Sequence, residues 1–147
     1  MLKLRKNKKG FTLVELIVVI AIMAVLAGTV AGVTVSQLNK QTDKTMASEA
    51  KGVADFISTW IIENNIELAD GMDTLASVKE TADSTDNLST ALTKQYNGKF
   101  EEGEGKKGQK LGVKVASKTI TVNYIGKTDK GSATYTINAE GIVTKTK

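Results

Sequence analysis

The stretch that decides the fold is FTLVELIVVIAIMAVLAGTVAGVTV, which runs from Phe11 to Val35 and holds 25 residues with a single charge, Glu15. As an α-helix it extends about 37 Å at about 1.5 Å per residue, whereas the hydrocarbon core of a bilayer is about 30 Å thick. The composition therefore predicts a helix over residues 11–35 that is long enough to span a membrane.

A basic leader, residues 1–10, precedes this segment. Five of the 20 basic residues of the chain fall within it, namely Lys3, Arg5, Lys6, Lys8 and Lys9. The other 15 basic residues face 16 acidic ones, so the net charge of +4 becomes −1 without the leader. Because basic flanks stay in the cytoplasm, the leader predicts that the C-terminal part lies outside. A nucleic-acid-binding arm is the alternative, but an apolar segment follows immediately, and no specific nucleic acid is inferred.

A cleavable secretory signal is a second interpretation of this N-terminus. Its apolar region is about 7–15 residues long and ends at a small-x-small site, for which Ala27 to Gly32 could serve. The length of the apolar run and the presence of Glu15 weigh against it. Glu15 also weighs against a plain signal anchor, because a carboxylate in a membrane helix costs about 2.5–3.5 kcal/mol.

The residues KKGFTLVEL, from Lys8 to Leu16, resemble the processing signature of type IV prepilins, which the pseudopilins of type II secretion and competence systems share. The match extends to about Ala27. The resemblance implies that a membrane prepilin peptidase cuts between Gly10 and Phe11 and then N-methylates Phe11. It also implies a single-pass precursor in the cytoplasmic membrane, which the pilus assembly machinery builds with copies of itself and other pilins into a surface pilus.

Glu15 has a specific use in such a filament. Cleavage creates an α-ammonium group on Phe11, and a stagger of four residues, about 6 Å, places it beside Glu15 of a neighbouring helix. Two charges about 4 Å apart gain roughly 4 kcal/mol at an effective dielectric of about 20, although buried pairs often only break even. The pair therefore sets register more than strength. Alternatively, Glu15 reaches the lipid headgroups or complements the dipole of its own helix.

Small residues recur at Ala24, Gly28 and Gly32. This spacing lets helices approach closely, but it is also ordinary glycine content for a membrane helix. Many pilins carry proline where this chain has Gly32 and glycine where it has Ala24, and their helix is often unwound between those points. The absent proline leaves that feature open here.

Beyond Val35 the helical pattern continues as an amphipathic half, residues 36–64. Its apolar positions follow helical spacing: Leu38, Met46, Val53, Phe56, Ile57, Trp60 and Ile61. A connecting region, residues 65–110, is expected to hold short helices, one of them capped by Asp86 and ended by Asn97-Gly98. A charged glycine-rich loop, residues 101–108, contains three glutamates, but their spacing matches no defined calcium loop.

From Leu111 the period changes to two, which predicts four short antiparallel strands within residues 111–147. Their apolar positions alternate with polar ones: Leu111, Val113, Val115, Ile120, Val122, Tyr124, Ala133, Tyr135 and Ile137, followed by Ile142 and Val143. The apolar face needs a cover, which the helix stripe from Val53 to Ile61 can supply. The expected class is α+β, a long helix packed on a small four-stranded sheet, which resembles the pilin fold.

The composition narrows the remaining functions. The chain has no cysteine, histidine or proline, so disulfides, thiolate or imidazole metal sites and His- or Cys-based catalysis are excluded. No catalytic residues, metal site or cofactor are predicted. The sequence favours a structural pilus subunit, with a pseudopilin as the alternative and a membrane-anchored binding module that never polymerises as the third interpretation.

Overall fold

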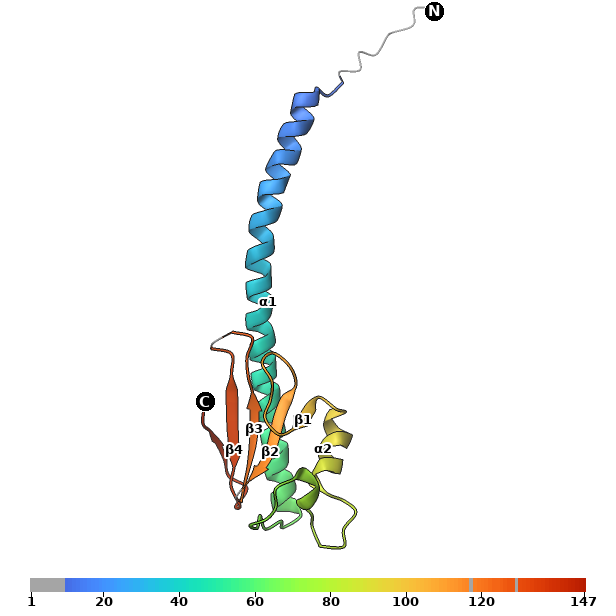
Figure 1. Cartoon of the computed structure of the whole chain (residues 1–147), viewed down its shortest axis with the longest axis vertical. Coiled ribbons are helices and arrows are strands. Elements are labelled where there is room, and N and C mark those ends of the chain that lie inside the picture. Colours follow the sequence, from blue (N-terminus) through green and yellow to red (C-terminus); the bar gives the residue numbers. More distant parts are fainter. Residues whose placement is uncertain (1–9, 117, 129) are drawn as a thin grey trace, which may run out of the picture. The chain divides into compact units, whose positions relative to one another are not determined.

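The computed structural model describes residues 10–116, 118–128 and 130–147. The chain divides into two compact units, an N-terminal unit, Met1–Leu38, and a C-terminal unit, Asn39–Lys147. Most of the basic leader lies outside the described residues. One long helix, α1 (Leu13–Glu63), contributes to both units, and all strands belong to the C-terminal unit (Figure 1).

Helix α1 ends where the sequence changes from apolar to Asn-rich. Asn65 adopts a left-handed conformation with φ of 50°, which asparagine tolerates better than most residues. The Ile66 amide then donates to the Ile61 carbonyl at 2.9 Å, and the Asn65 amide donates to the Ile62 carbonyl at 3.2 Å. These two bonds satisfy carbonyls that the last helical turn leaves open. The end therefore lies at Glu63, beside the predicted end at Asn64.

The sheet has five strands, so the expected count of four was wrong. They are β1 (Phe100–Glu102), β2 (Leu111–Ala116), β3 (Thr119–Tyr124), β4 (Ala133–Ile137) and β5 (Val143–Lys145), in that spatial order. The missed strand, β1, pairs parallel with β2, and the other neighbours are antiparallel. Its three residues, Phe-Glu-Glu, are too short to show a period of two. The last strand begins at Val143, which pairs with Ile137, so Ile142, which is 60% exposed, lies just before it.

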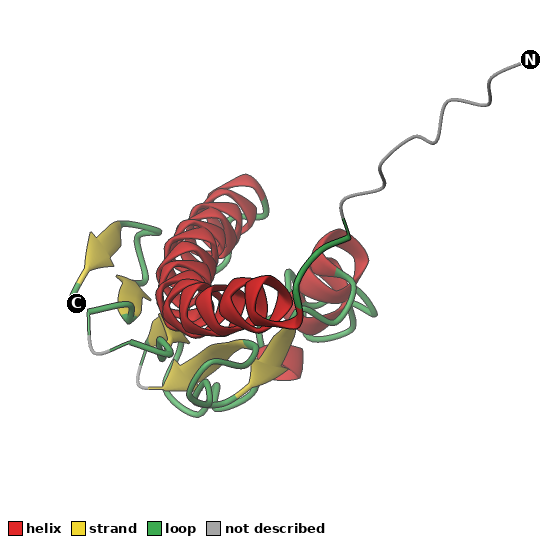
Figure 2. Ribbon diagram, turned by 90° about the horizontal axis from the view of Figure 1, so that it is seen from above, coloured by secondary structure: helices red, strands yellow, loops and turns green. Residues whose placement is uncertain are grey.

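The predicted helix-on-sheet core is confirmed. Side chains on alternate positions of β2, β3 and β4 are buried, and they form one cluster with the buried face of α1, which comprises Ala50, Val53, Ala54, Ile57 and Ile61. Figure 2 shows the strands along one side of this helix. Met46 and Trp60 are partly buried against the same cluster, as core contacts. The fold class is therefore α+β.

A second helix, α2 (Leu88–Tyr96), follows a short 3₁₀ turn, Leu75–Ser77. Its N-cap is Asn87, not Asp86 as predicted, because the Asn87 side chain accepts a bond from the Thr90 amide at 2.9 Å. The helix ends at Asn97, as expected, in a left-handed conformation.

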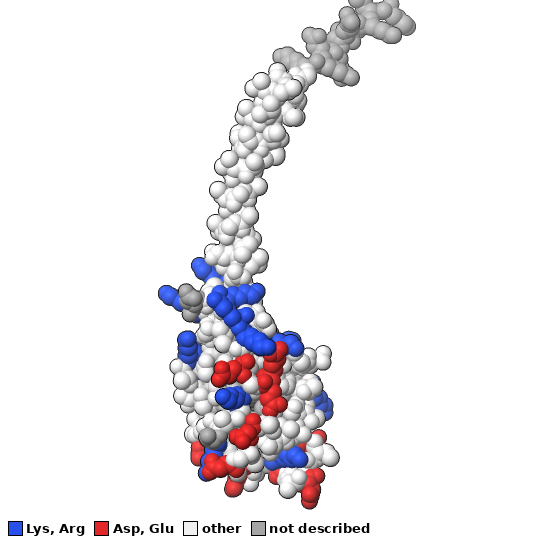
Figure 3. All heavy atoms as spheres, in the orientation of Figure 1, with Lys and Arg blue, Asp and Glu red and all other residues white. Residues whose placement is uncertain are grey.

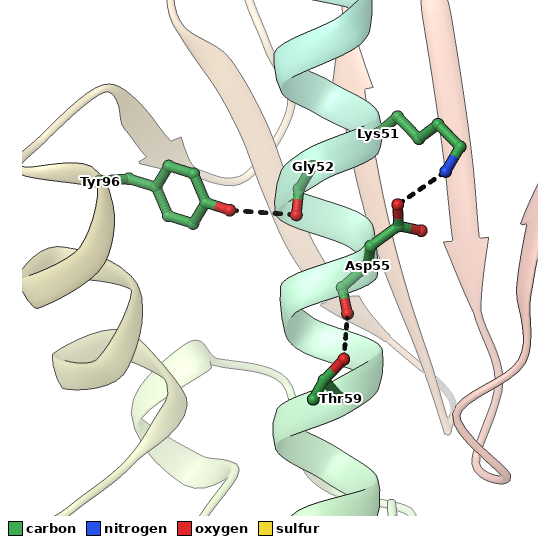
Figure 4. Close-up of polar contacts among 5 residues, drawn as sticks. All are labelled: Lys51, Gly52, Asp55, Thr59 and Tyr96. Atoms are coloured by element: carbon green, nitrogen blue, oxygen red, sulfur yellow. Dashed lines mark hydrogen bonds and ion pairs between the residues drawn. The ribbon is translucent and has the colours of Figure 1, made fainter.

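Tyr96 joins α2 to α1. Its hydroxyl donates to the Gly52 carbonyl at 3.0 Å (Figure 4). Its ring also meets the Phe56 ring edge-on, with centroids 5.7 Å apart. On the same stretch of α1, Lys51 and Asp55 form an exposed ion pair at 2.7 Å. The ring contact and the hydrogen bond fix α2 beside the helix, whereas an exposed pair of this kind adds little.

Asp43 is a buried carboxylate that holds the β3–β4 loop against α1. It is 2% exposed and accepts four hydrogen bonds: from the Tyr124 hydroxyl at 2.9 Å, the Lys127 amide at 2.8 Å, and the Thr128 amide and hydroxyl at 2.9 and 2.6 Å. Burial alone raises the pKa of Asp43, but these bonds outweigh it and lower the pKa to about 2. Burial and the bond to Asp43 raise the pKa of Tyr124 to about 12, so the phenol remains a donor.

Replacing Asp43 with asparagine is expected to lower the free energy of unfolding of the C-terminal unit by about 2–4 kcal/mol, because an amide nitrogen cannot accept the bonds from Thr128. Since folding lowers the pKa of Asp43, its contribution is present above the ordinary value of 3.8 and disappears as the pH falls toward 2. Urea unfolding of the full chain in detergent, followed by the single tryptophan, Trp60, measures both effects. The matched change at exposed Asp55 should cost far less; equal costs would refute the buried anchor.

Candidate processing and assembly site

The predicted cleavage site lies just before α1 and is open to solvent. Gly10, Phe11 and Thr12 precede the first helical residue, and Phe11 is 88% exposed. A Cβ atom added at Gly10 meets no other group within 4 Å. The fold itself therefore does not demand glycine at position 10, and a requirement for glycine there must come from whatever acts on this bond.

Glu15 closes a capping box with Thr12 at the start of α1. The Thr12 amide and hydroxyl both donate to Glu15 Oε2 at 2.9 Å, and the Glu15 amide donates to the Thr12 hydroxyl at 3.2 Å. Two donors that the first helical turn leaves open are thus satisfied. Thr12 is a site residue that the sequence reasoning missed, although the pattern Thr-x-x-Glu before an apolar run was the signal for it.

The capping box leaves part of the Glu15 carboxylate available. Both bonds from Thr12 go to Oε2, and within the described residues Oε1 has no hydrogen-bond partner. Glu15 is also exposed, so a cation can reach it from outside the chain. In the isolated chain Glu15 thus caps the N-terminus of its own helix, which was the alternative role. This role occupies Oε2 and leaves Oε1 available.

The apolar half of α1 has no cover within its own unit. Its large aliphatic side chains, from Leu13 to Val35, are about half exposed or more, with values from 48 to 74%. Among the described residues, α1 is the helix long and apolar enough to cross a membrane, a test that a signal sequence near the N-terminus also passes. A helix that is apolar on every side needs lipid or other apolar helices around it.

Ala24, Gly28 and Gly32 lie along one face of α1, four residues apart. A Cβ atom added at either glycine meets nothing within 4 Å, so the row is open in this chain. The helix continues without interruption through this stretch. Nearby hydroxyls are satisfied within the helix, because Thr29 and Thr34 donate to the carbonyls of Leu26 and Val30.

The charged segment 101–108 begins within β1, which includes Glu101 and Glu102, and two of its glutamates make other contacts. Glu102 accepts a bond from the Leu75 amide at 2.7 Å, and Glu104 lies 3.6 Å from Lys114. Over the ranges that the structure describes, no group of three or more acidic side chains is placed to hold a metal ion.

Comparisons with known proteins agree with the features of this N-terminus. Residues 5–31 match the prokaryotic N-terminal methylation motif. The type IV major fimbrial protein FimA of Dichelobacter nodosus, strain VCS1703A, is 28% identical over 154 aligned positions, which cover 88% of this chain and 90% of FimA. A second FimA sequence from the same species matches equally well. No solved structure matches the chain. The resemblance to type IV pilins is thus confirmed.

Proposed function

We propose that this chain is the precursor of a type IV pilus subunit, cut between Gly10 and Phe11 by a prepilin peptidase and N-methylated on Phe11. The observation that carries the proposal is Glu15, the single acidic residue in a helical segment whose apolar side chains are exposed on every side. The methylation motif over residues 5–31 and the match to a fimbrial protein across most of the chain support a pilin-type structural subunit, not an enzyme.

Polymerisation follows from the chemistry of the new N-terminus. Cleavage places a positive charge on Phe11, one turn before Glu15, and an offset of about 6 Å brings it to Glu15 of the next copy. Oε1 accepts this ammonium group while Oε2 keeps its bonds to Thr12. Since an unpaired carboxylate is strongly disfavoured in an apolar core, copies enter at this offset. Ala24, Gly28 and Gly32 then allow close packing of the helices.

Before assembly, the apolar half of α1 holds the precursor in the cytoplasmic membrane. The basic leader keeps the N-terminus in the cytoplasm, so the C-terminal unit lies outside. Cleavage removes that leader, after which the pilus machinery moves the subunit from the membrane into the filament. The apolar helix exchanges lipid for neighbouring helices, which keeps its surface out of water in both states.

A pseudopilin of a secretion or DNA-uptake system is the second candidate, because pseudopilins resemble prepilins in the same N-terminal signature. The match to a major fimbrial protein over 90% of that protein's length favours the pilus. A pseudopilin would stay in the envelope in short assemblies, which makes the two functions separable by location.

Mechanical shearing of cells that produce this chain tests the proposal. We expect surface filaments whose main component is this protein, visible by electron microscopy and identified by immunoblot of the sheared fraction. Retention of all processed protein in the envelope would favour the pseudopilin. A monomer that stays in the membrane with its leader intact would favour an anchored module and refute the proposal.

A further inference from the structure

A groove in the C-terminal unit is lined by four exposed lysines: Lys40, Lys44, Lys130 and Lys145. It has a volume of about 510 Å³ and lies between α1, the β3–β4 loop and β5. Figure 3 shows lysines gathered at the upper end of this unit on the visible face. We call this feature the basic groove.

Among the described residues, the basic groove carries more positive than negative charge, since four lysines and one carboxylate, that of Asp43, line it. Within the described residues, none of its four lysines forms an ion pair. Asp43 also lines the groove, but its two oxygens already accept four hydrogen bonds from the loop and Tyr124. Asp129 belongs to the same loop by sequence and lies outside the described residues. Four positive charges against one negative charge around one hollow favour an anionic occupant.

The sheet register defines which end of the C-terminal unit this is. Gly112 pairs with Asn123, and Tyr124 pairs with Ala133, so the start of β2, the end of β3 and the start of β4 lie together. The β3–β4 loop at this end carries Lys127 and Lys130. Lys40 and Lys44 lie on the first turns of α1 within the same unit, beside that loop.

The opposite end of the C-terminal unit is acidic. Eight exposed carboxylates lie on the last turn of α1, the segment after it and the β4–β5 turn: Glu63, Glu67, Asp70, Asp73, Glu80, Asp83, Asp86 and Glu140. Glu67 and Glu140 line one surface hollow, and Glu67 and Glu80 line another together with Lys79. Asp70 pairs with Lys118 of the β2–β3 turn at 3.2 Å, which places it at this end of the sheet. We call these residues the acidic end.

The two charged surfaces lie far apart on one unit. From Lys40 to Glu63 the helix contains 24 residues, or about 35 Å at about 1.5 Å per residue. The screening length at physiological ionic strength is about 8 Å, so the groove and the acidic end do not neutralise each other within one copy. Each surface is therefore free to attract an opposite charge on a neighbouring molecule.

We propose that the basic groove binds the acidic end of another copy of this chain. The inference rests on the proposed polymerisation and adds a contact that the apolar helix does not provide. Copies in a polar filament meet through two different surfaces, since a heterologous contact joins unlike patches. Because the C-terminal unit has opposite charges at its two ends, every copy supplies one basic groove and one acidic end for such a contact. The charge complementarity therefore favours a second copy over lipid headgroups or nucleic acid.

Charge reversal in the full chain tests the proposal. Lys44→Glu with Lys130→Glu reverses the groove, and Glu67→Lys with Asp73→Lys reverses the acidic end; none of these four side chains has an ion pair within the described residues. We expect either double variant to lower the yield of sheared filaments at least tenfold. Combining all four changes restores opposite charges and should bring the yield within about threefold of wild type.

A matched control for the groove reversal makes the same change in net charge at positions that lie between the two ends. Lys51→Glu with Lys99→Glu replaces the ion pairs with Asp55 and Glu49 by like charges at the surface, and should leave the yield unchanged, because surface pairs of this kind add little. Precursor levels and N-terminal cleavage are measured for every variant, which separates assembly from folding and processing. If wild-type chain forms no filaments, the proposed function fails and this inference with it.

Three further outcomes would overturn the inference alone. One is a normal filament yield from both double variants. Another is a variant with all four changes that assembles no better than either double variant. If the groove reversal lowers the yield but the acidic-end changes neither lower it alone nor restore it in combination, the groove would instead be assigned to another anionic occupant, such as lipid headgroups.

Cysteine cross-linking gives a direct readout, because the chain has no cysteine. Filaments of Lys130→Cys with Asp73→Cys are expected to yield a ladder of disulfide-linked multimers after oxidation. Each single variant should give no ladder. A ladder that is absent from the double variant, in filaments of normal yield, would contradict the contact.

Discussion

Replacing Glu15 with valine is expected to abolish surface filaments while leaving cleavage after Gly10 intact. Valine fits the apolar helix, so the protein should reach the membrane in normal amounts. The loss arises because the Phe11 ammonium group of a neighbouring copy no longer has a carboxylate partner, and a buried unpaired charge is strongly disfavoured. Immunoblots of the sheared and membrane fractions measure assembly and processing separately.

The capping box requires a control for this result, because Glu15 also bonds to Thr12. Thr12→Val removes the hydroxyl partner but keeps the carboxylate, and a lost cap costs only about 1 kcal/mol. It should therefore retain filaments. Glu15→Gln keeps a hydrogen-bond acceptor but loses the charge, so it should fail like Glu15→Val. If Thr12→Val were as defective as Glu15→Val, the capping role would explain the phenotype and the pairing role would be wrong.

Replacing Gly10 with valine is expected to block cleavage, so that the full precursor accumulates in the membrane and no filaments form. In the structure a side chain at Gly10 meets nothing within 4 Å, so the change should not disturb the fold. The block is expected because a β-branched residue restricts the backbone and shields the scissile bond from a peptidase. Without cleavage, the positive terminus stays at Met1, ten residues before the position that Glu15 needs.

Gly28→Val serves as the matched control for this variant, since it also adds a β-branched side chain where the chain leaves open space. It should be cleaved normally, whatever its effect on helix packing. If Gly10→Val yields mature protein at wild-type levels, cleavage does not require glycine at position 10. Gel mobility and intact mass distinguish precursor from mature chain in both variants.

Helix α1 and strands β2 to β4 were predictable because each repeats a strong pattern over several residues. The apolar run fixes the helix by length, and the alternation from Leu111 fixes the strands. The α1 stripe that covers the sheet was also visible, since Val53, Ile57 and Ile61 recur at helical spacing and are buried.

Periodicity could not predict very short elements or contacts between residues far apart in the sequence. β1 contains three residues and depends on pairing with β2, and the N-cap moved from Asp86 to Asn87 because neighbouring polar residues cap equally well. Asp43 was missed for a different reason. Its burial depends on donors 81 to 85 residues later in the chain, in a loop whose position no local pattern specifies.

Some residues of the candidate sites were also predictable from a local motif, and others were not. Gly10, Phe11 and Glu15 were identified from a local motif, and the structure adds that Thr12 caps the helix through Glu15. The charged ends of the C-terminal unit were not apparent from the net charge of −1 outside the leader, because opposite charges cancel in a sum. Only the strand register and the loop contacts separate them in space.

Intact-mass and N-terminal sequence analysis of protein taken from sheared filaments tests whether the subunit is cut after Gly10. We expect a mature chain that begins at N-methylated Phe11, with the residues from Met1 to Gly10 absent. Filament protein that retains those ten residues, or that begins near residue 33 after removal of a secretory signal, would contradict it.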